Sequence, residues 1–213
     1  MTTEAALSIE MGRNIGDIII SQDGKAHKRV VRVPDYLGSL NDCPDASDYE
    51  RLVGGSINFL QNPRWGVQEM IPPCTLRLEE AKANFSGVEC WIDTVWIKGI
   101  PLSQMMSVPN SVAEQLAFFL KKCKDMACEG KTHGEIVIPD LLGGVSDPQT
   151  TFQNFVVEEE TGKLYFVDVY PLAEFPKGFS LLKYQYRPRL NKAAQKIGHP
   201  HVIQAARELA AAI

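Results

Sequence analysis

The sequence lacks the short motifs that mark several large enzyme classes. It contains no Gly-x-Ser-x-Gly, no His-Glu-x-x-His and no Walker-type phosphate loop. These patterns place a nucleophilic serine, bind zinc on one helix face and surround nucleotide phosphates with backbone N–H groups. The sequence therefore argues against an α/β-hydrolase, a zincin-type metalloprotease and a P-loop nucleotidase.

Paired cysteines and an excess of basic residues are also missing. The five cysteines are an odd number, and no Cys-x-x-Cys pair occurs. This pattern argues against a disulfide framework and against a cysteine-based structural zinc site. The formal net charge of −4 leaves no surplus of Lys and Arg for the phosphates of a nucleic acid or an anionic membrane. We therefore expect neither partner.

Long apolar runs are absent as well. No segment approaches the roughly 20 apolar residues that cross a bilayer, and residues 1–4 have neither the charge nor the apolar stretch of a cleaved signal. We expect a reduced, cytoplasmic protein; delivery into another cell as an effector is compatible with the same features. With 45% hydrophobic residues, the 213-residue chain can form one large domain or two small lobes.

An ordered set of acid, amide and acid is the most informative feature present. Asp140 follows the apolar run 136–139, Asn154 opens the run 155–157, and Asp168 closes the run 165–167. The last two runs flank a polar stretch that contains Gly162, which predicts a β-hairpin with Asn154 and Asp168 at its outer ends. Neighbouring oxygen ligands of this kind suit Mg²⁺, with phosphate completing its shell.

The first third of the chain predicts strands followed by a helix. Residues 7–34 indicate three strands, with Gly12 and Gly16 in the first part and an Asp23-Gly24 turn further on. Apolar residues recur at spacings of three and four over 45–60, which predicts a helix capped by Ser47 or Asp48. Lys28 and Arg32 lie on the predicted strand before this helix, and Glu50 lies on the helix itself.

The remaining elements follow from similar signals. After the stretch 71–80, residues 87–97 predict one long strand or a strand pair, and a Gly-Ile-Pro-Leu turn follows. Ser111 and Glu114 form a capping box, which predicts a helix from there to about Glu129, ended by Gly130. Pro200 opens a further predicted helix over 201–212.

Taken in this order, the residues resemble the protein-kinase-like superfamily, which includes protein kinases and aminoglycoside- and choline-type phosphotransferases. The resemblance implies that Asp140 is the base or orients the acceptor, and that Asn154 and Asp168 are metal ligands. It further implies ATP and Mg²⁺ as cofactors, a nucleotide partner, and a small-molecule or protein acceptor.

The resemblance also assigns roles in the first half of the chain. Gly12 and Gly16 would cover the phosphates, and Arg32, or alternatively Lys28, would supply the positive charge that Glu50 holds in place. A backbone segment that includes Ile97 would receive the adenine.

The chain departs from the family in its catalytic segment. Ile138-Pro139 stands in place of the usual His and Arg, and Val169-Tyr170 in place of Phe-Gly. The long stretch between Asp140 and Asn154 also admits Asp147, or even Glu135, as the working acid.

The expected fold is α+β with two lobes. Residues 1–100 would form a small β-rich N-lobe with one helix, and residues 101–213 a truncated helical C-lobe, because only 45 residues follow Asp168 and no Ala-Pro-Glu segment is present. An active phosphotransferase is the favoured function. An inactive kinase-like module that binds a nucleotide or protein is the alternative. In a third hypothesis, an unrelated α+β interaction protein, the Asp and Asn residues are turn formers.

Two of the four histidines, His199 and His201, flank Pro200. A two-histidine metal site and an exposed turn both fit this spacing.

Overall fold

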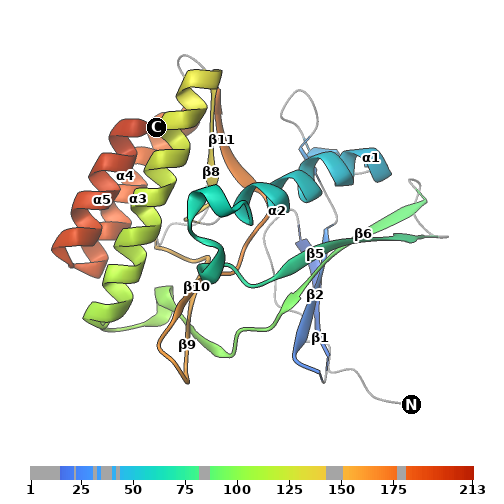
Figure 1. Ribbon diagram of the computed structural model, residues 1–213, viewed down its shortest axis with the longest axis horizontal. Helices are drawn as coiled ribbons and strands as arrows, with labels where there is room; N and C mark the ends of the chain where they lie inside the picture. Colours follow the sequence, from blue (N-terminus) through green and yellow to red (C-terminus); the bar gives the residue numbers. More distant parts are fainter. Residues whose placement is uncertain are drawn as a thin grey trace. The chain divides into compact units, whose positions relative to one another are not determined.

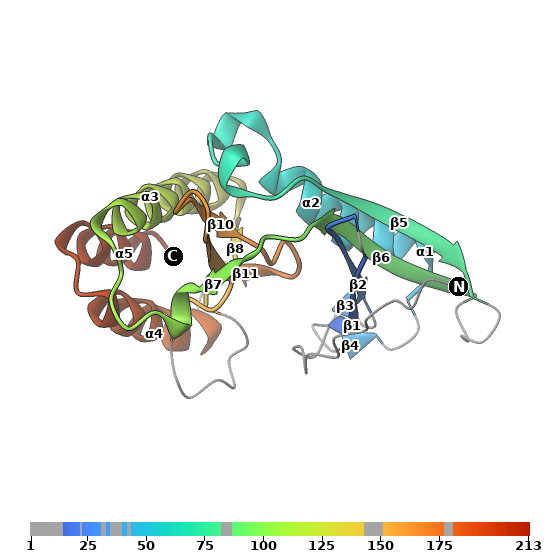
Figure 2. The ribbon, with the colours of Figure 1, turned by 90° about the horizontal axis from the view of Figure 1, so that it is seen from below.

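The computed structural model describes most of the chain (Figures 1 and 2). The described residues are 15–21, 23–30, 33–34, 40–41, 44–81, 87–142, 151–176 and 181–213. Gly12, Arg32 and Asp147 lie outside these ranges. The elements form a mixed α+β structure, which confirms the predicted class. No helix in the described ranges has both the length and the apolar character that a bilayer crossing requires.

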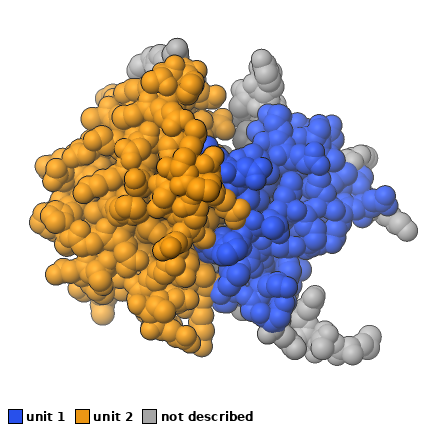
Figure 3. Space-filling model, in the orientation of Figure 1, with its two compact units in different colours: residues 1–59, 72–96 blue, residues 60–71, 97–213 orange. Residues whose placement is uncertain are grey.

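The chain divides into two compact units (Figure 3). Unit 1 comprises Met1–Phe59 and Pro72–Trp96, and unit 2 comprises Leu60–Ile71 and Ile97–Ile213. The division into lobes at residues 1–100 and 101–213 was derived from the family resemblance and stays a prediction.

Unit 1 is built on a four-stranded antiparallel sheet with the order β1-β2-β6-β5. Its strands are β1 (Ile15–Ile20), β2 (Lys25–Val30), β5 (Cys74–Glu80) and β6 (Val88–Val95), and a short pair joins β3 (Val33–Pro34) to β4 (Leu40–Asn41). The predicted Asp23-Gly24 turn connects β1 to β2. Gly24 has φ +80°, a conformation that glycine adopts without strain.

A helical segment covers one face of this sheet. It consists of α1 (Ala46–Tyr49), the π-helical η1 (Glu50–Gly54) and α2 (Gly55–Leu60). Its buried side chains, Tyr49, Val53 and Ile57, recur at helical spacing, and α1 contacts β6 while η1 contacts β5. The cap differs from the prediction, because the carboxylate of Asp45 accepts the N–H of Asp48 at 2.9 Å and so takes the capping position.

The opposite face of the sheet is polar because side chains alternate along each strand. Asp93 accepts hydrogen bonds from Arg77 at 2.7 Å and pairs with His27 at 2.8 Å. Arg77 also lies over the ring of Trp91, with its guanidinium carbon 5.4 Å from the centroid. The core of unit 1 therefore lies between its sheet and its helix.

Unit 2 combines two small sheets with three long helices. One sheet has the order β10-β9-β7, and the other pairs β11 with β8. The strands are β7 (Gly99–Pro101), β8 (Glu135–Pro139), β9 (Phe155–Glu158), β10 (Leu164–Phe166) and β11 (Leu172–Pro176). The helices are α3 (Asn110–His133), α4 (Leu181–Ile197) and α5 (Pro200–Ala212), with single turns η2 (Pro63–Trp65), η3 (Gln68–Met70) and η4 (Leu102–Gln104).

The three long helices lie side by side (Figures 1 and 2). Helix α5 packs against both α3 and α4, and α3 packs against β8. The predicted helix over 201–212 corresponds to α5. Helix α4 was not predicted, because Pro188 lies inside it and proline normally interrupts a helical pattern.

Helix α3 differs from its prediction at both ends. It begins at Asn110 after Pro109, whose carbonyl accepts the N–H groups of Val112 and Ala113, so Ser111 lies inside the first turn and does not cap. It also continues through Gly130 to His133. Gly134, with φ +98°, ends it.

Candidate metal centre

Asp140 is held where strand β8 ends. Ile138, two residues before it, and Leu141 and Leu142, just after it, are completely buried. The N–H of Leu141 donates a hydrogen bond of 3.1 Å to the hydroxyl of Tyr186 on α4. Buried neighbours on both sides and this hydrogen bond fix the position of the Asp140 backbone.

Asn154 and Asp168 lie at the outer ends of the predicted hairpin, which the structure contains as β9 and β10. The strands pair with Phe155 opposite Phe166. One step further out, the N–H of Val167 donates to the carbonyl of Asn154 at 2.9 Å. Asn154 is therefore directly across the hairpin from the residue that precedes Asp168.

An aromatic cluster anchors this hairpin to α3. The ring of Phe119 lies 5.2 Å from that of Phe155, edge to face, and 5.4 Å from that of Phe166, stacked. All three side chains are completely buried. Because Phe155 follows Asn154 and Phe166 comes two residues before Asp168, the cluster sets the place of both candidate ligands.

A side-chain hydrogen bond joins the hairpin to Asp140. The amide nitrogen of Asn154 donates to the backbone carbonyl of Asp140 at 2.6 Å. Because the nitrogen is used in this way, the amide oxygen is the acceptor that remains for a ligand. The structure thus brings together the three residues Asp140, Asn154 and Asp168.

Electrostatics also couple the two acids. Burial, together with the nearby negative charge of Asp168, raises the pKa of Asp140 to about 6. The N–H of Leu142, 3.3 Å from the Asp140 carboxylate, and the positive charge of Arg189 act in the opposite direction without cancelling the rise.

This donor set fits a hard divalent cation. The carboxylate of Asp168 and the amide oxygen of Asn154 are of the kinds that Mg²⁺ takes as ligands in proteins, usually with several waters or phosphate oxygens in its remaining positions. A bound cation would also relieve the repulsion that raises the Asp140 pKa.

Glu135, the other acid considered for the working position, does not join this group. It is exposed at the first residue of β8, whereas Asp140 follows the last one. At roughly 3.3 Å per strand residue, the two lie about 16 Å apart along the strand.

The candidate nucleotide-site residues from the first half of the chain lie on different structural elements. Gly16 is in β1, and Lys28 is in β2, where it is 7% exposed on the same face as Ala26 and Val30. Glu50 is exposed at the start of η1, and within the described part of the chain no ion pair joins it to Lys28. Ile97 begins the second part of unit 2, between β6 and β7.

Sequence reasoning missed the contributions of α4. Tyr186 and Arg189 act on Asp140 from a helix that the sequence pattern did not indicate, and no local signal links them to it. A cluster of Glu114 with His199 and His201 also involves a residue that the sequence suggested only as a helix cap.

No protein-family model matches this chain, and no curated protein matches it at a significant level.

Proposed function

We propose that this chain is an ATP- and Mg²⁺-dependent phosphotransferase of a minimal kinase-like type, which transfers the γ-phosphate to a hydroxyl acceptor. The observation that carries the proposal is the convergence of Asp140, Asn154 and Asp168. Asn154 donates to the Asp140 carbonyl at 2.6 Å, and the N–H of Val167 donates to the Asn154 carbonyl at 2.9 Å.

The order of elements gives further support. In the kinase-like family, a strand that carries a cation precedes a helix, and a long helix precedes the catalytic acid. Here β2 carries the largely buried Lys28 and precedes the α1–α2 segment, and α3 precedes β8 and Asp140. Under the proposal, Arg32 steadies the phosphates and Glu50 holds Arg32 in place, or Lys28 steadies them without Glu50. Gly12 and Gly16 cover the phosphates, and the backbone around Ile97 receives the adenine.

The chemistry assigned to the metal group is positional and electrostatic. Asn154 and Asp168 would hold Mg²⁺, which when bound neutralises charge on the β- and γ-phosphates. The acceptor oxygen bonds to the γ-phosphorus, the bond from that phosphorus to the β–γ bridging oxygen breaks, and ADP leaves with the bond's electron pair. Asp140 orients the acceptor hydroxyl and takes its proton. A pKa of about 6 keeps the carboxylate ionised at pH 7 yet close enough to neutrality to accept that proton.

Thermal unfolding with and without nucleotide tests the proposal. Mg·ATP is expected to raise the Tm of the full chain, and Asp168→Ala to remove the shift, because ligand binding stabilises only the state that binds. Asp125→Ala is the matched control, since Asp125 is an exposed acid on α3 whose nearest cation, Lys122, is 3.7 Å away. It should retain the full shift.

Transfer from γ-labelled ATP separates the hypotheses. Label on a hydroxyl acceptor, lost in Asp140→Asn and Asp168→Ala, supports the phosphotransferase. A Tm shift without transfer to any protein or small-molecule acceptor would identify an inactive nucleotide-binding module. No shift with any nucleotide would leave the unrelated interaction protein.

A further inference from the structure

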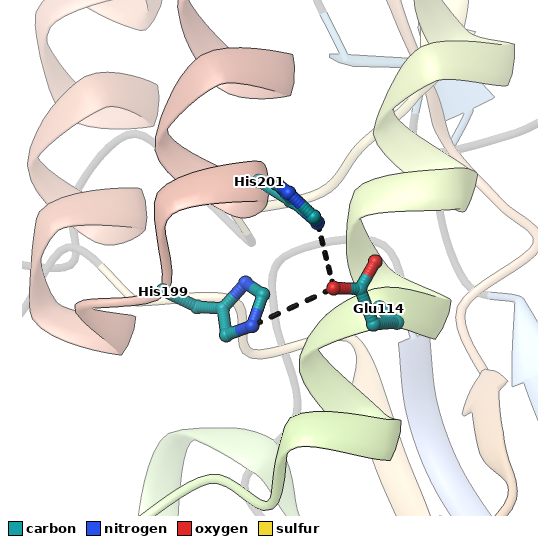
Figure 4. A group of neighbouring side chains, drawn as sticks. All are labelled: Glu114, His199 and His201. Carbon is teal, nitrogen blue, oxygen red and sulfur yellow. Dashed lines mark hydrogen bonds and ion pairs between the residues drawn. The ribbon is translucent and has the colours of Figure 1, made fainter.

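Glu114, His199 and His201 form a cluster on unit 2 (Figure 4). The Nδ1 atom of His201 lies 2.6 Å from Oε1 of Glu114, and Nε2 of His199 lies 3.6 Å from the same oxygen. One ligand atom from each residue lies within 4.8 Å of the others. The two imidazole rings are 5.3 Å apart at an interplanar angle of 78°.

The local sequence explains why both rings reach one carboxylate. The residue before a proline is restricted to extended conformations, and His199 has φ −85° and ψ 128°. Pro200 then occupies the first position of α5, where its fixed φ suits a helix, and His201 follows inside the first turn. The change from extended to helical backbone across one proline turns two side chains toward α3.

The two helices that carry the cluster are tied together elsewhere as well. Lys124 of α3 and Glu208 of α5 form an ion pair of 2.9 Å. Since Glu114 meets the start of α5 and Lys124 meets its later part, α3 and α5 run in the same direction. The three donors are therefore supported by packed helices, which keeps their mutual geometry stable.

We propose that Glu114, His199 and His201 bind a Zn²⁺ ion that links the start of α3 to the start of α5. Imidazole nitrogens and a carboxylate oxygen are zinc ligands, and three protein ligands leave the fourth tetrahedral position to water. The proposal does not depend on the phosphotransferase function, because it involves none of Asp140, Asn154 and Asp168.

The donor distances are compatible with zinc after small rotations. Tetrahedral donors at 2.0–2.1 Å from zinc lie roughly 3.3 Å from one another. The observed separations of 3.6 Å and 2.6 Å lie on either side of that value. In the metal-free protein, the short contact is a hydrogen bond between His201 and Glu114, which zinc must displace.

The surroundings of His199 set the expected strength of binding. Among the described residues, its Nδ1 atom is buried without a hydrogen-bond partner. Metal-bound histidines usually donate their second nitrogen to a carboxylate or carbonyl, and loss of such a partner weakens binding by about 10- to 100-fold. We therefore expect weaker zinc binding here than at a site whose histidines all have such a partner.

Calorimetric titration of the full chain with Zn²⁺ tests the site, in a Cys128→Ser background because the exposed Cys128 thiol is a competing ligand. One ion per chain is expected to bind and to raise the Tm. Co²⁺ is expected to give the visible absorption bands of a low-coordinate nitrogen and oxygen site. His199→Ala, His201→Ala and Glu114→Gln should each weaken binding at least about tenfold.

His133→Ala is the matched control, since His133 is exposed at the end of α3 and belongs to no such group. It should bind zinc as the parent protein does. Glu114→Gln keeps a side-chain oxygen that can still accept a hydrogen bond from His201, so we expect it to fold. Its zinc affinity therefore tests the proposal even if a histidine variant fails to fold. Unchanged zinc binding in Glu114→Gln, equal losses in His133→Ala, or no stoichiometric binding would overturn the proposal.

Discussion

At the scale of single residues, Asp140 is an acid whose surroundings disfavour its ionised form. Burial and the charge of Asp168 raise its pKa from 3.8 to about 6. Between about pH 4 and pH 6 the folded protein therefore keeps a proton that the unfolded chain has released. Stability falls as pH rises through this window, because the folded state binds more protons there than the unfolded state.

Asp140→Asn should make the nucleotide-free protein more stable at neutral pH. The variant cannot ionise at this position, but its side-chain amide oxygen can still accept the hydrogen bond from the Leu142 N–H. Its backbone carbonyl still accepts the hydrogen bond from the Asn154 side chain. We expect a gain on the order of 2 kcal/mol in the free energy of unfolding at pH 7, and no difference below pH 4. Urea denaturation at several pH values measures it.

Asp125→Asn serves as the control for that experiment. Asp125 is an exposed acid on α3, so its substitution should change stability by less than about 0.5 kcal/mol at any pH. If Asp140→Asn proved less stable than the parent protein at pH 7, the electrostatic account of this acid would be wrong.

At the scale of elements, α3 packs closely against β8, the strand that precedes Asp140. A Cβ atom added to Gly130 would lie 2.4 Å from the carbonyl oxygen of Glu135 and 3.0 Å from the Cα of Ile136. No side chain can occupy that space. The glycine that local signals indicated as a helix end is therefore a point of close packing inside the helix.

Gly130→Ala should consequently destabilise the protein, although alanine is normally the better helix former. Because the backbone of β8 must move, we expect a loss of about 2 kcal/mol or more in the free energy of unfolding. The matched control is Gly55→Ala in α2, where an added Cβ meets nothing within 4 Å. There the usual gain of up to about 1 kcal/mol is expected.

Chemical denaturation of both glycine variants checks this comparison. An increase in the free energy of unfolding of Gly130→Ala would show that the β8 backbone does not pack closely against Gly130.

At the scale of the whole molecule, the chain passes between its two units three times. Residues 60–71 belong to unit 2, although unit 1 continues after them at Pro72. Within unit 2, η2 contacts α3 and η3 contacts β10, and Arg64 forms an ion pair of 2.8 Å with Glu129. Neither unit is therefore a continuous piece of sequence.

A fragment of residues 1–96 should expose apolar surface for this reason. Trp65, Val67, Met70 and Ile71 are buried in the full chain, and the fragment lacks the helix and strand that η2 and η3 contact. We expect it to bind a hydrophobic dye and to associate. Replacing residues 60–71 with a Gly-Ser linker of equal length should reduce both signals, as fluorescence and size-exclusion chromatography would show. Equal signals would contradict this assignment of 60–71.

Features that depend on neighbouring residues were readable from the sequence. The Asp23-Gly24 turn, the β9–β10 hairpin with Gly162 at φ +68°, and helix α5 behind Pro200 all follow local preferences of the backbone. The α+β class followed from the same kind of signal.

Features that depend on distant residues required the tertiary structure. Local sequence spacing does not indicate the hydrogen bond from Asn154 to Asp140 or the effect of α4 on the Asp140 pKa. It also does not indicate the contact between Glu114 and His201, which are 87 residues apart. Packing in the interior selects these contacts, and it also overrode the local signals for Gly130 and Pro188. Backbone preference acts within a few residues, whereas the grouping of charged side chains is decided by which buried surfaces fit together.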